Sequence, residues 1–488
     1  MFSRFYFRKD ELELVMNKML YKKRRHSPFP YLRIREISKH NKYFLKYENI
    51  SKGVWRMTDE FCALLGVRRH YNADIVTKTR LAHPGHATTS GICSACIKCG
   101  ACEIGKKAKT GRTLFPEPFG TTQFGAEKRL PSINDLQILP QIIGEEVIFR
   151  DVDTSVTIGG FKSNLPLVVA AMGSTIVAHK HGTDLARGAA RAGIPMVIGE
   201  NVMATYGEKG LKARIKPYLD EYTGEGGLIV QANVEDQKMG VPEKAVEFGT
   251  HAIELKMGQG AKMGLGGEIE ILDKDIEKYR ELGYTIVDRP GLTAERHSSP
   301  GTITEKSLKE TLLKYKELGV PIWIKIAAGR GIIEFIKMCQ RIKRKKKVPL
   351  ECITVDGHGG GTGMSPWLVM NEVGLPSASI FCRLDAKKLS FDILLAGGFT
   401  NGMDVGKAMM LGASGVAMGR AFLIAANVAK VEGIVNFVKA VKEEMQMLAA
   451  VERVRKVSEL RHRRGNLLAL TREASIMFGI SDEVRRII

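Results

Sequence analysis

Eight short runs of apolar and β-branched residues between residues 166 and 419 alternate with stretches of helical character. A strand, a helix and a second parallel strand form one unit, and eight such units can close into a (β/α)8 TIM barrel. An open, doubly wound sheet also alternates, but eight units ending in two glycine-terminated strands favour the barrel. The runs are PLVVAA (166–171), PMVIG (195–199), GLIVQA (227–232), HAIELK (251–256), PIWIKI (321–326), ECITVD (351–356), DILLAG (392–397) and GVAMG (415–419).

The sequence on either side of the barrel has a different character and predicts appendages. The start is rich in charge and predicts helices and loops, and glycine and proline then punctuate a segment that holds a cysteine cluster. The end of the chain is charged with helical periodicity, which predicts a role in packing or assembly. We expect a basic helical extension at 1–75, a cysteine-cluster segment at 76–135, the barrel at 136–430 and a helical tail at 431–488.

Two of the segments between predicted strands are unusually long, at 257–304 and 357–390. Both follow strands, so in a barrel both fall on the C-terminal face. Barrel enzymes build their active sites on that face. We therefore look for functional residues at the ends of the predicted strands.

Half of the eight cysteines lie in GICSACIKCGACEIGKK (91–107), with the spacing C-x2-C-x2-C-x2-C. Disulfides between cysteines this close would be strained, and the other four cysteines are scattered singly. An evenly spaced run can wrap around a compact cluster, so we favour [4Fe–4S], with zinc or a redox dithiol as alternatives. The last gap is one residue shorter than in the bacterial ferredoxin run. The predicted ligands are Cys93, Cys96, Cys99 and Cys102.

The formal net charge of +21 is concentrated in YKKRRHSPFPYLRIR near the N-terminus and in RIKRKKK at 341–347. An acidic electron-donor protein would complement such basic surfaces. No nucleic-acid-binding motif lies beside either cluster, so we do not expect nucleic acid as a partner. Because charges interrupt every apolar run, we expect neither a secretory leader nor a transmembrane segment. We expect a cytoplasmic protein, where thiols stay reduced.

Glycine-rich stretches stand at the ends of the seventh and eighth predicted strands. In LLAGGFTNGMDVGKAMMLGASGVAMGRAF, the seventh strand runs into Gly397 and Gly398, and the eighth runs into Gly419 and Arg420. Glycine backbone lets N–H groups approach a phosphate, and a following helix N-terminus adds a favourable dipole. Because barrels commonly bind phosphate with these two loops, the four residues are candidate phosphate ligands.

The fifth and sixth strands supply further candidates. Lys325 lies inside an apolar run at the end of the fifth strand, where a lysine needs either an anionic partner or a reason to be desolvated. The sixth strand leads into VDGHGGGTGMSP, in which glycines surround His358, a candidate catalytic or ligand residue. Such a bare backbone can lie against a planar ligand or its phosphate chain.

The fourth strand leads into ELKMGQGAKMGLGG, where Lys256, Gln259 and Lys262 stand among glycines. These cationic and amide donors suit an acidic substrate. Glu200 follows the second run and Glu225 stands just before the third; both can be read equally well as loop carboxylates or as site residues.

Three motifs in this order resemble the FMN-binding synthase domain of glutamate synthase and its stand-alone FMN-dependent relatives: ELKMGQGAKMGLGG, VDGHGGGTGMS and LLAGGFTNGMDVGKAMMLGASGVAMGRAFLIA. The resemblance covers roughly residues 110–430. It implies a β/α barrel that carries FMN on its C-terminal face. Glutamate synthases combine ammonia with 2-oxoglutarate and reduce the imine with hydride from the flavin.

The resemblance also implies residue roles. Lys325 would neighbour the flavin ring, while Lys256, Gln259 and Lys262 would face the substrate dicarboxylate. The glycines after the sixth strand would line the isoalloxazine or the phosphate, and those after the last two strands would hold the phosphate. The implied cofactor residues are Lys325, Gly359, Gly360, Gly361, Thr362, Gly397, Gly398, Gly419 and Arg420.

Three features depart from the family pattern. The family's cluster cysteines follow the eighth strand, whereas FLIAANVAK has none here and the candidate cluster lies at 93–102. The family's GEGG reads GLGG, with Leu265 in place of the acid, and RHSSPGTITEKSL replaces a histidine-rich segment.

No nucleophilic cysteine near the start marks a glutamine amidotransferase domain. Ammonia would therefore come free or from a separate glutaminase subunit, and electrons from a donor protein or reductase subunit.

Two other classes of function stay open. A flavin-free barrel lyase or isomerase acting on a sugar phosphate would use a zinc-stabilised cysteine loop, with Lys325 binding an anion or forming a Schiff base. A non-catalytic electron-transfer or scaffold subunit would keep the flavin without turning over a substrate. The colour of the purified protein separates these classes, because flavin is yellow, an iron–sulfur cluster is brown and zinc is colourless.

Overall fold

The computed structural model describes the barrel and much of what surrounds it. The described residues are 5–8, 32–37, 42–47, 108–111, 130–260, 268–271, 275–281, 284–288, 294–297, 299–358 and 373–484. The predicted site residues that lie outside them are Cys93, Cys96, Cys99, Cys102, Lys262, Gly359, Gly360, Gly361 and Thr362.

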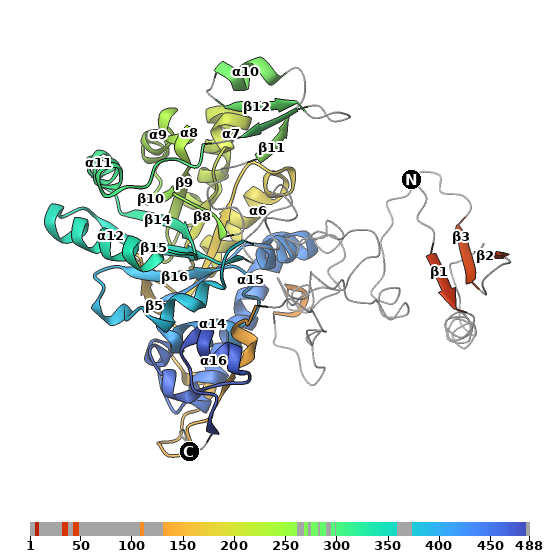
Figure 1. Cartoon of the computed structure of the whole chain (residues 1–488), viewed down its shortest axis with the longest axis vertical. Helices are drawn as coiled ribbons and strands as arrows, with labels where there is room; N and C mark the ends of the chain where they lie inside the picture. The colour runs from red at the N-terminus through yellow and green to blue at the C-terminus, as the bar shows by residue number, and fades with distance from the viewer. Residues whose placement is uncertain are drawn as a thin grey trace.

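The eight runs predicted from the sequence form the eight parallel strands of one closed barrel (Figure 1). The strands are β7 (Leu167–Met172), β8 (Met196–Ile198), β9 (Leu228–Ala232), β10 (Ala252–Lys256), β14 (Ile322–Ala327), β15 (Leu350–Asp356), β16 (Asp392–Ala396) and β17 (Gly415–Met418). Strands pair in chain order, and β17 closes the barrel by pairing Met418 with Val169 of β7. The predicted (β/α)8 barrel is confirmed.

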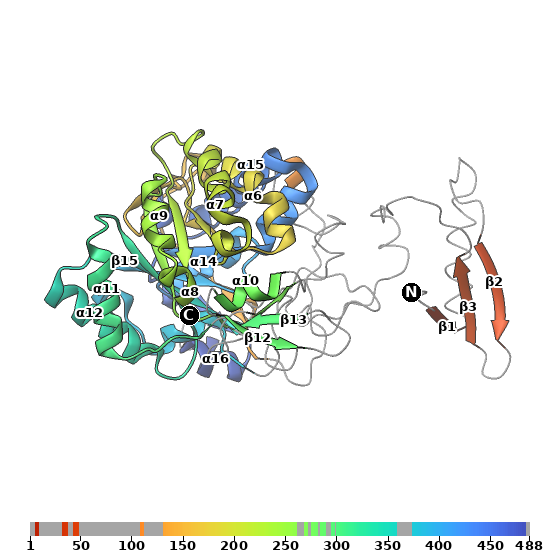
Figure 2. The ribbon, with the colours of Figure 1, turned by 90° about the horizontal axis from the view of Figure 1, so that it is seen from above.

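Helices surround the barrel and begin or end at residues suited to those positions (Figure 2). The main helices are α6 (Ile176–Ala192), α7 (Val202–Leu219), α8 (Val234–Lys238), α9 (Val241–Glu247), α11 (Glu305–Lys316), α12 (Ile332–Lys346), α14 (Gly402–Leu411) and α15 (Arg420–Val451). Thr175 caps α6 by accepting a hydrogen bond from the N–H of Ala178, and Gly193 ends the same helix in the left-handed region at φ 65°.

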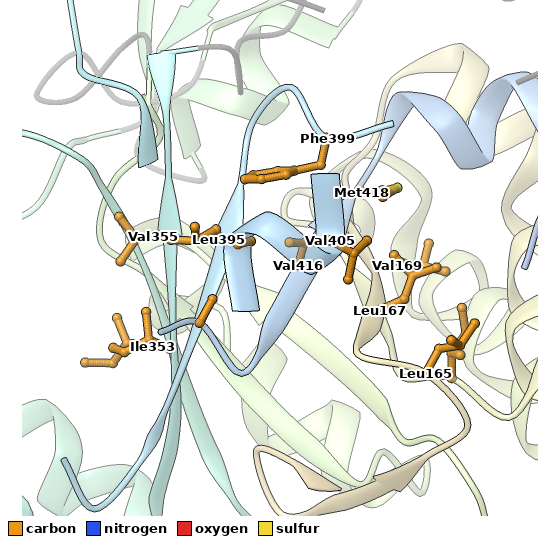
Figure 3. Close-up of a cluster of buried hydrophobic side chains, with 14 of the residues drawn as sticks. Leu165, Leu167, Val169, Ile353, Val355, Leu395, Phe399, Val405, Val416 and Met418 are labelled. Carbon is orange, nitrogen blue, oxygen red and sulfur yellow. The ribbon is translucent and has the colours of Figure 1, made fainter. Parts of the chain in front are cut away.

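Barrel strands turn alternate side chains outward to the helices and inward to the barrel axis. The outward side chains and the helices form one large apolar core. Figure 3 shows part of it, with Leu165, Leu167, Val169, Ile353, Val355, Leu395, Phe399, Val405, Val416 and Met418 labelled. A second buried cluster contains inward side chains such as Val168, Ile229 and Leu394.

A hairpin closes the N-terminal end of the barrel. It consists of β5 (Val156–Ile158) and β6 (Phe161–Ser163). The indole Nε1 of buried Trp323 donates to the Gly159 carbonyl at 3.0 Å, and the Gly159 N–H donates to Asp392 at 2.8 Å. A ligand therefore has to approach from the C-terminal end.

The long segment after β10 contains a small antiparallel sheet in the order β11–β13–β12. Its elements are β11 (Glu268–Ile271), α10 (Ile276–Glu281), β12 (Thr285–Asp288) and β13 (Ala294–His297). Tyr279 and Tyr284 pack with Ala204 of α7, and the Tyr284 hydroxyl donates to Asn201 Oδ1 at 3.0 Å. Because it follows a strand, this insertion belongs to the C-terminal face, as expected from the sequence.

Helix α15 packs against α6, and the two lie side by side in Figures 1 and 2. It is kinked at Ala429 and Lys430. Of the helices in the described ranges, α15 alone is long and apolar enough to meet a length-and-composition test for a membrane span. Much of its apolar surface is buried against the rest of the protein, as is usual for a core helix.

The tail after α15 returns to the beginning of the barrel segment. There β18 (Leu467–Ala469) pairs with β4 (Leu136–Ile138), and α16 (Arg472–Phe478) follows. The short 3-10 helices are η1 (Ile133–Asp135), η2 (Phe149–Asp151), η6 (Ser377–Cys382), η7 (Ala386–Lys388), η8 (Val457–Leu460) and η9 (Arg464–Asn466).

The first region contains strands where the sequence analysis predicts helices. These strands are β1 (Phe5–Arg8), β2 (Leu32–Ile37) and β3 (Lys42–Tyr47), which form one antiparallel sheet. In β2, LRIREI begins with a strict alternation of apolar and charged residues, and KYFLKY in β3 is rich in aromatic residues. Both features favour strands, and the abundant charge had obscured them.

Candidate functional site

The C-terminal half of the barrel interior has a polar wall and an apolar wall. The polar wall comes from four neighbouring strands, β9, β10, β14 and β15, and each of its residues is at most 8% exposed. The remaining strands contribute small or branched apolar residues. Because apolar layers normally fill a barrel, a buried polar wall indicates a binding site. The polar wall is Gln231, Glu254, Lys325, Thr354 and Asp356; the apolar wall includes Val168, Ala170, Val197, Leu394, Ala396 and Ala417.

Lys325 is the positive centre of the polar wall. Its Nζ lies 3.4 Å from Asp356 Oδ2, which also accepts a hydrogen bond from the Gly260 N–H at 3.2 Å. Burial opposes the lysine charge, but the carboxylates of Asp356, Glu254 and Glu200 outweigh it and raise the Lys325 pKa above its ordinary value. Lys325 is therefore a cation at neutral pH.

Glu254 lies beside this pair on β10 and is 1% exposed. Its carboxylate accepts hydrogen bonds from the Gln231 amide and, at 3.0 Å, from the Thr354 hydroxyl. Burial raises the Glu254 pKa, although the charge of Lys325 acts in the opposite direction. Glu254 therefore holds its proton to a higher pH than an exposed glutamate does.

Lys256 and Gln259 form a second cluster at the end of β10. The Lys256 ammonium donates to the Glu200 carboxylate and, at 2.9 Å, to Gln259 Oε1. Glu200 follows β8, so the barrel brings together side chains that lie far apart in the sequence. Both ends of the Lys256–Glu200 ion pair are largely buried, with side-chain exposures of 11% and 18%.

His358 follows β15 and lies outside both clusters. Its backbone N–H donates to the Leu375 carbonyl at 3.0 Å, and its buried ring Nδ1 has no hydrogen-bond partner within the part of the chain that the structure describes. Burial lowers the His358 pKa, so the imidazole is neutral at pH 7. A neutral ring with a vacant nitrogen can donate or accept a hydrogen bond.

The predicted phosphate loops have the required backbone, but one of the two following helices does not contribute its N-terminus. Gly397 and Gly398 adopt φ angles of 99° and 93°, a region open to glycine. At the start of α14, Glu444 accepts from the Gly402 N–H at 2.7 Å and Asn401 accepts from the Asp404 N–H at 2.8 Å. These side chains already accept hydrogen bonds from two of the N–H groups in the first turn of α14.

Helix α15 provides the other N-terminus. Gly419 is its N-cap and places no side chain over the first turn, and Arg420 is its first residue. Together with Gly397 and Gly398, which follow the adjacent strand β16, this turn fits a phosphate. The apolar wall and Lys325 fit a flat, electron-rich ring, so the described residues are compatible with FMN.

A cavity of about 490 Å³ lies between the end of β14 and the start of α12. Gly260, which donates to Asp356, and Ile326, which follows Lys325, both line it. Most of its other lining is apolar, including Ile303, Phe335 and Leu375, and Arg330 adds a cation. Its volume is in the range of small-molecule sites.

Sequence reasoning missed most of the polar wall, yet a signal was present. On β9, β10 and β15, the polar residues Gln231, Glu254 and Thr354 stand two positions after inward-facing Ile229, Ala252 and Cys352. Lys325 has the same relation to Trp323. Counting alternate positions across neighbouring strands would have placed all four side chains on the inner face.

Known proteins identify this barrel. Residues 160–432 match the family described as the conserved region in glutamate synthase. An archaeal-type glutamate synthase (NADPH) of Thermotoga maritima is 28% identical over 272 residues, covering 54% of this chain and 48% of the relative. A glutamate synthase large subunit-like protein of Rhizobium meliloti is 25% identical over 321 residues, covering 62% and 66%. The chain spans about half the length of the archaeal-type relatives it matches.

Among solved structures, a flavocytochrome b2 variant with sulfite bound superposes with a TM-score of 0.51 at 19% identity, covering 72% of this chain and 81% of that one. This likeness supports the barrel fold. The family match extends over more than half of the chain and contains all eight barrel strands, the polar wall and the phosphate glycines. The chain therefore belongs to the glutamate synthase family, and its barrel is an FMN-binding synthase domain.

Proposed function

We propose that the protein is an FMN-dependent oxidoreductase of the glutamate synthase type. It would reduce the imine of 2-oxoglutarate and ammonia to glutamate, with electrons delivered through a [4Fe–4S] cluster at Cys93, Cys96, Cys99 and Cys102. The observation that carries the proposal is the buried polar wall, with a charged lysine at the open end of a barrel of this family. An electron-donor protein or reductase subunit would supply the electrons, in the cytoplasm.

We assign the chemical tasks to the described residues, together with Lys262, which lies outside them. Bound FMN would supply hydride to the imine carbon. Lys325 keeps a positive charge at the mouth of the barrel. Asp356, which accepts a hydrogen bond from the Gly260 N–H, fixes the position of this charge. Lys256 and Gln259, with Lys262, would bind the substrate carboxylates; a carboxylate arriving at Lys256 would take the place now held by Glu200. Reduction also needs a proton on the imine nitrogen, and the Lys256 ammonium carries one.

The cavity between the end of β14 and the start of α12 favours a second candidate substrate class. Its lining is mostly apolar, with Arg330 as a cation, which suits a 2-oxo acid with an apolar side chain better than a dicarboxylate. Turnover of a panel of 2-oxo acids with ammonia, using a chemically reduced enzyme, distinguishes the two classes. If the enzyme prefers an apolar 2-oxo acid, that acid replaces 2-oxoglutarate as the proposed substrate, and the proposed flavin chemistry is unchanged.

Cofactor analysis of anaerobically purified protein tests the proposal as a whole. We expect one FMN and four iron atoms per chain, with flavin absorbance and a broad brown band. Protein without flavin would support the lyase or isomerase alternative. Stoichiometric zinc without iron would exclude the cluster, and bound flavin without turnover of any 2-oxo acid would indicate a non-catalytic electron-transfer subunit.

Replacing Cys96 by Ser should remove the brown absorbance and the iron while FMN stays bound. A cluster held by four thiolates does not survive the loss of one strong ligand when the cysteines form a single short run. Iron analysis and visible spectra measure the result. Cys382→Ser is the matched control, because this exposed cysteine lies far from the run in sequence. An iron content that Cys96→Ser leaves unchanged would remove Cys96 from the ligand set.

Replacing Lys256 by Met should raise the KM for 2-oxoglutarate by roughly 10-fold to 100-fold, because one charge-assisted hydrogen bond contributes about 1.5–3 kcal/mol. Glu200→Gln should lower the KM, since it removes the anion that competes for Lys256. Lys238→Met, at an exposed position on α8, is the control. Steady-state kinetics decide; the same KM in all four proteins would exclude Lys256 from substrate binding.

A further inference from the structure

Arg214 on α7 is a buried cation that has no counterion among the described residues. The residue is 4% exposed, and no carboxylate within the described ranges forms an ion pair with it. Burial lowers the Arg214 pKa to about 10, while the Tyr206 phenol acts in the opposite direction. Its Nε and Nη2 make no hydrogen bond to described residues. Burying a guanidinium without a counterion costs free energy. We therefore ask what Arg214 does at this position.

The hydrogen bonds of Arg214 identify what it holds. Its Nη1 donates to the carbonyls of Met172 and Gly173 at 3.2 and 2.8 Å, and the Tyr206 hydroxyl donates to the Ser174 carbonyl at 2.9 Å. Three successive carbonyls of the turn between β7 and α6 thus face α7. A trans peptide directs its N–H away from its carbonyl, so the three following N–H groups point away from α7.

These N–H groups, of residues 173–175, donate to no acceptor that the described part of the chain provides. Ser174 is 7% exposed, and its hydroxyl likewise has no partner among the described residues. Successive N–H groups on one side of a turn form a concave site for an electron-rich atom. The turn follows β7, which pairs with β17, so it borders the loop that carries Gly419.

We propose that Arg214 is a positioning residue of the flavin site. It turns the three N–H groups of the β7–α6 turn toward the mouth of the barrel and places a positive charge behind them. The electron-rich edge of the flavin ring is the ligand that this donor set would take. A fixed positive potential favours negative charge, so Arg214 should stabilise the reduced flavin more than the oxidised flavin. This inference rests on the proposed FMN function.

Arg214→Gln tests the charge, because glutamine keeps a neutral donor near the two carbonyls. We expect the affinity for reduced FMN relative to oxidised FMN to fall about tenfold, which corresponds to about 30 mV for a two-electron couple. Arg214→Lys retains the charge and should stay within about threefold of the wild type on the same scale. Spectroelectrochemical titration of the FMN-loaded proteins gives these ratios, and thermal melts of the same samples report stability.

Two further variants separate positioning from structural support. Tyr206→Phe releases only the Ser174 carbonyl. It should lower the affinity for reduced FMN relative to oxidised FMN by about threefold, since it removes one neutral hydrogen bond. Arg187→Gln, on the exposed face of α6, should change nothing. A lower melting temperature with an unchanged potential in Arg214→Gln would overturn the proposal and leave a structural or phosphate-side role.

If Arg214→Gln does not fold, Tyr206→Phe decides, and an unchanged potential there overturns the proposal. Different results overturn the role of Arg214 and the proposed FMN function. A wild-type chain that binds no FMN overturns both this role and the proposed function. A wild-type chain that binds and uses FMN, with an unaltered potential in the variants, overturns only the role of Arg214.

Discussion

Replacing Lys325 by Met is expected to lower substrate turnover by about 100-fold to 1,000-fold, the usual cost of removing one preorganised electrostatic group. The residue is 8% exposed, and three carboxylates keep it charged. A buried cation beside the ring favours the reduced, anionic flavin, so the midpoint potential of the variant should fall. FMN content should change much less, because the phosphate loops dominate cofactor binding.

The same lysine also contributes to stability, and the experiment has to separate the two effects. Removing one partner of a buried ion pair typically costs about 3–5 kcal/mol, since the other charge is left uncompensated. Lys325→Met should therefore lower the melting temperature. Adding Asp356→Asn removes the stranded carboxylate and should restore much of the stability without restoring turnover or potential.

Lys337→Met, an exposed lysine on α12, is the control for both measurements. A purely structural Lys325 predicts lost thermal stability with an unshifted potential, and recovery of turnover in the double variant. An equal or higher midpoint potential in Lys325→Met would remove this lysine from the catalytic residues and weaken the assignment of β14 to the flavin side of the site.

The barrel could be predicted from sequence because each of its strands is a short apolar run with helix-forming residues between it and the next. All eight runs proved to be strands, even β8, which is only three residues long. Residues 5–8, 32–37 and 42–47 were mispredicted, because the high charge of this region was read as typical of helices and loops. LRIREI and KYFLKY instead form a sheet, in which charged side chains can alternate with apolar or aromatic ones.

The site was predictable only in part. Lys325 stood out because lysine is rare inside an apolar run, whereas Glu254 and Thr354 resembled ordinary polar interruptions. Their meaning depends on which strands are neighbours and which side chains share the inner face, and both follow only from a closed barrel. The Lys256–Glu200 pair joins β10 to β8 across β9, a contact that no local pattern encodes.

The phosphate site shows a different limit of sequence reasoning. Glycines after β16 and β17 predict close backbone approach, and the Gly397 and Gly398 φ angles agree with that expectation. The sequence could not show that Glu444, which lies 42 residues after Gly402 on α15, caps the start of α14. This contact leaves the turn at Gly419 and Arg420 as the helix N-terminus suited to a phosphate.

Gly398→Val should therefore yield a folded protein without bound FMN. Gly398 has a φ of 93°, which a β-branched residue adopts only with strain, and a side chain there would cover the backbone that approaches the phosphate. Loss of two charge-assisted hydrogen bonds, each contributing about 1.5–3 kcal/mol, corresponds to a fall in FMN affinity of more than about 100-fold.

Gly319→Val is the matched control for backbone strain. Gly319 has a φ of 71°, and a Cβ atom there would meet nothing within 4 Å, so valine brings the same kind of strain without a clash. It precedes β14 and so lies at the opposite end of the barrel from the phosphate loops. Both variants should lose similar thermal stability, about 1–3 kcal/mol, but only Gly398→Val should lose the yellow colour. FMN contents that fall equally in the two proteins would show that strain alone releases the cofactor, and a normal content in Gly398→Val would move the phosphate away from the β16 loop.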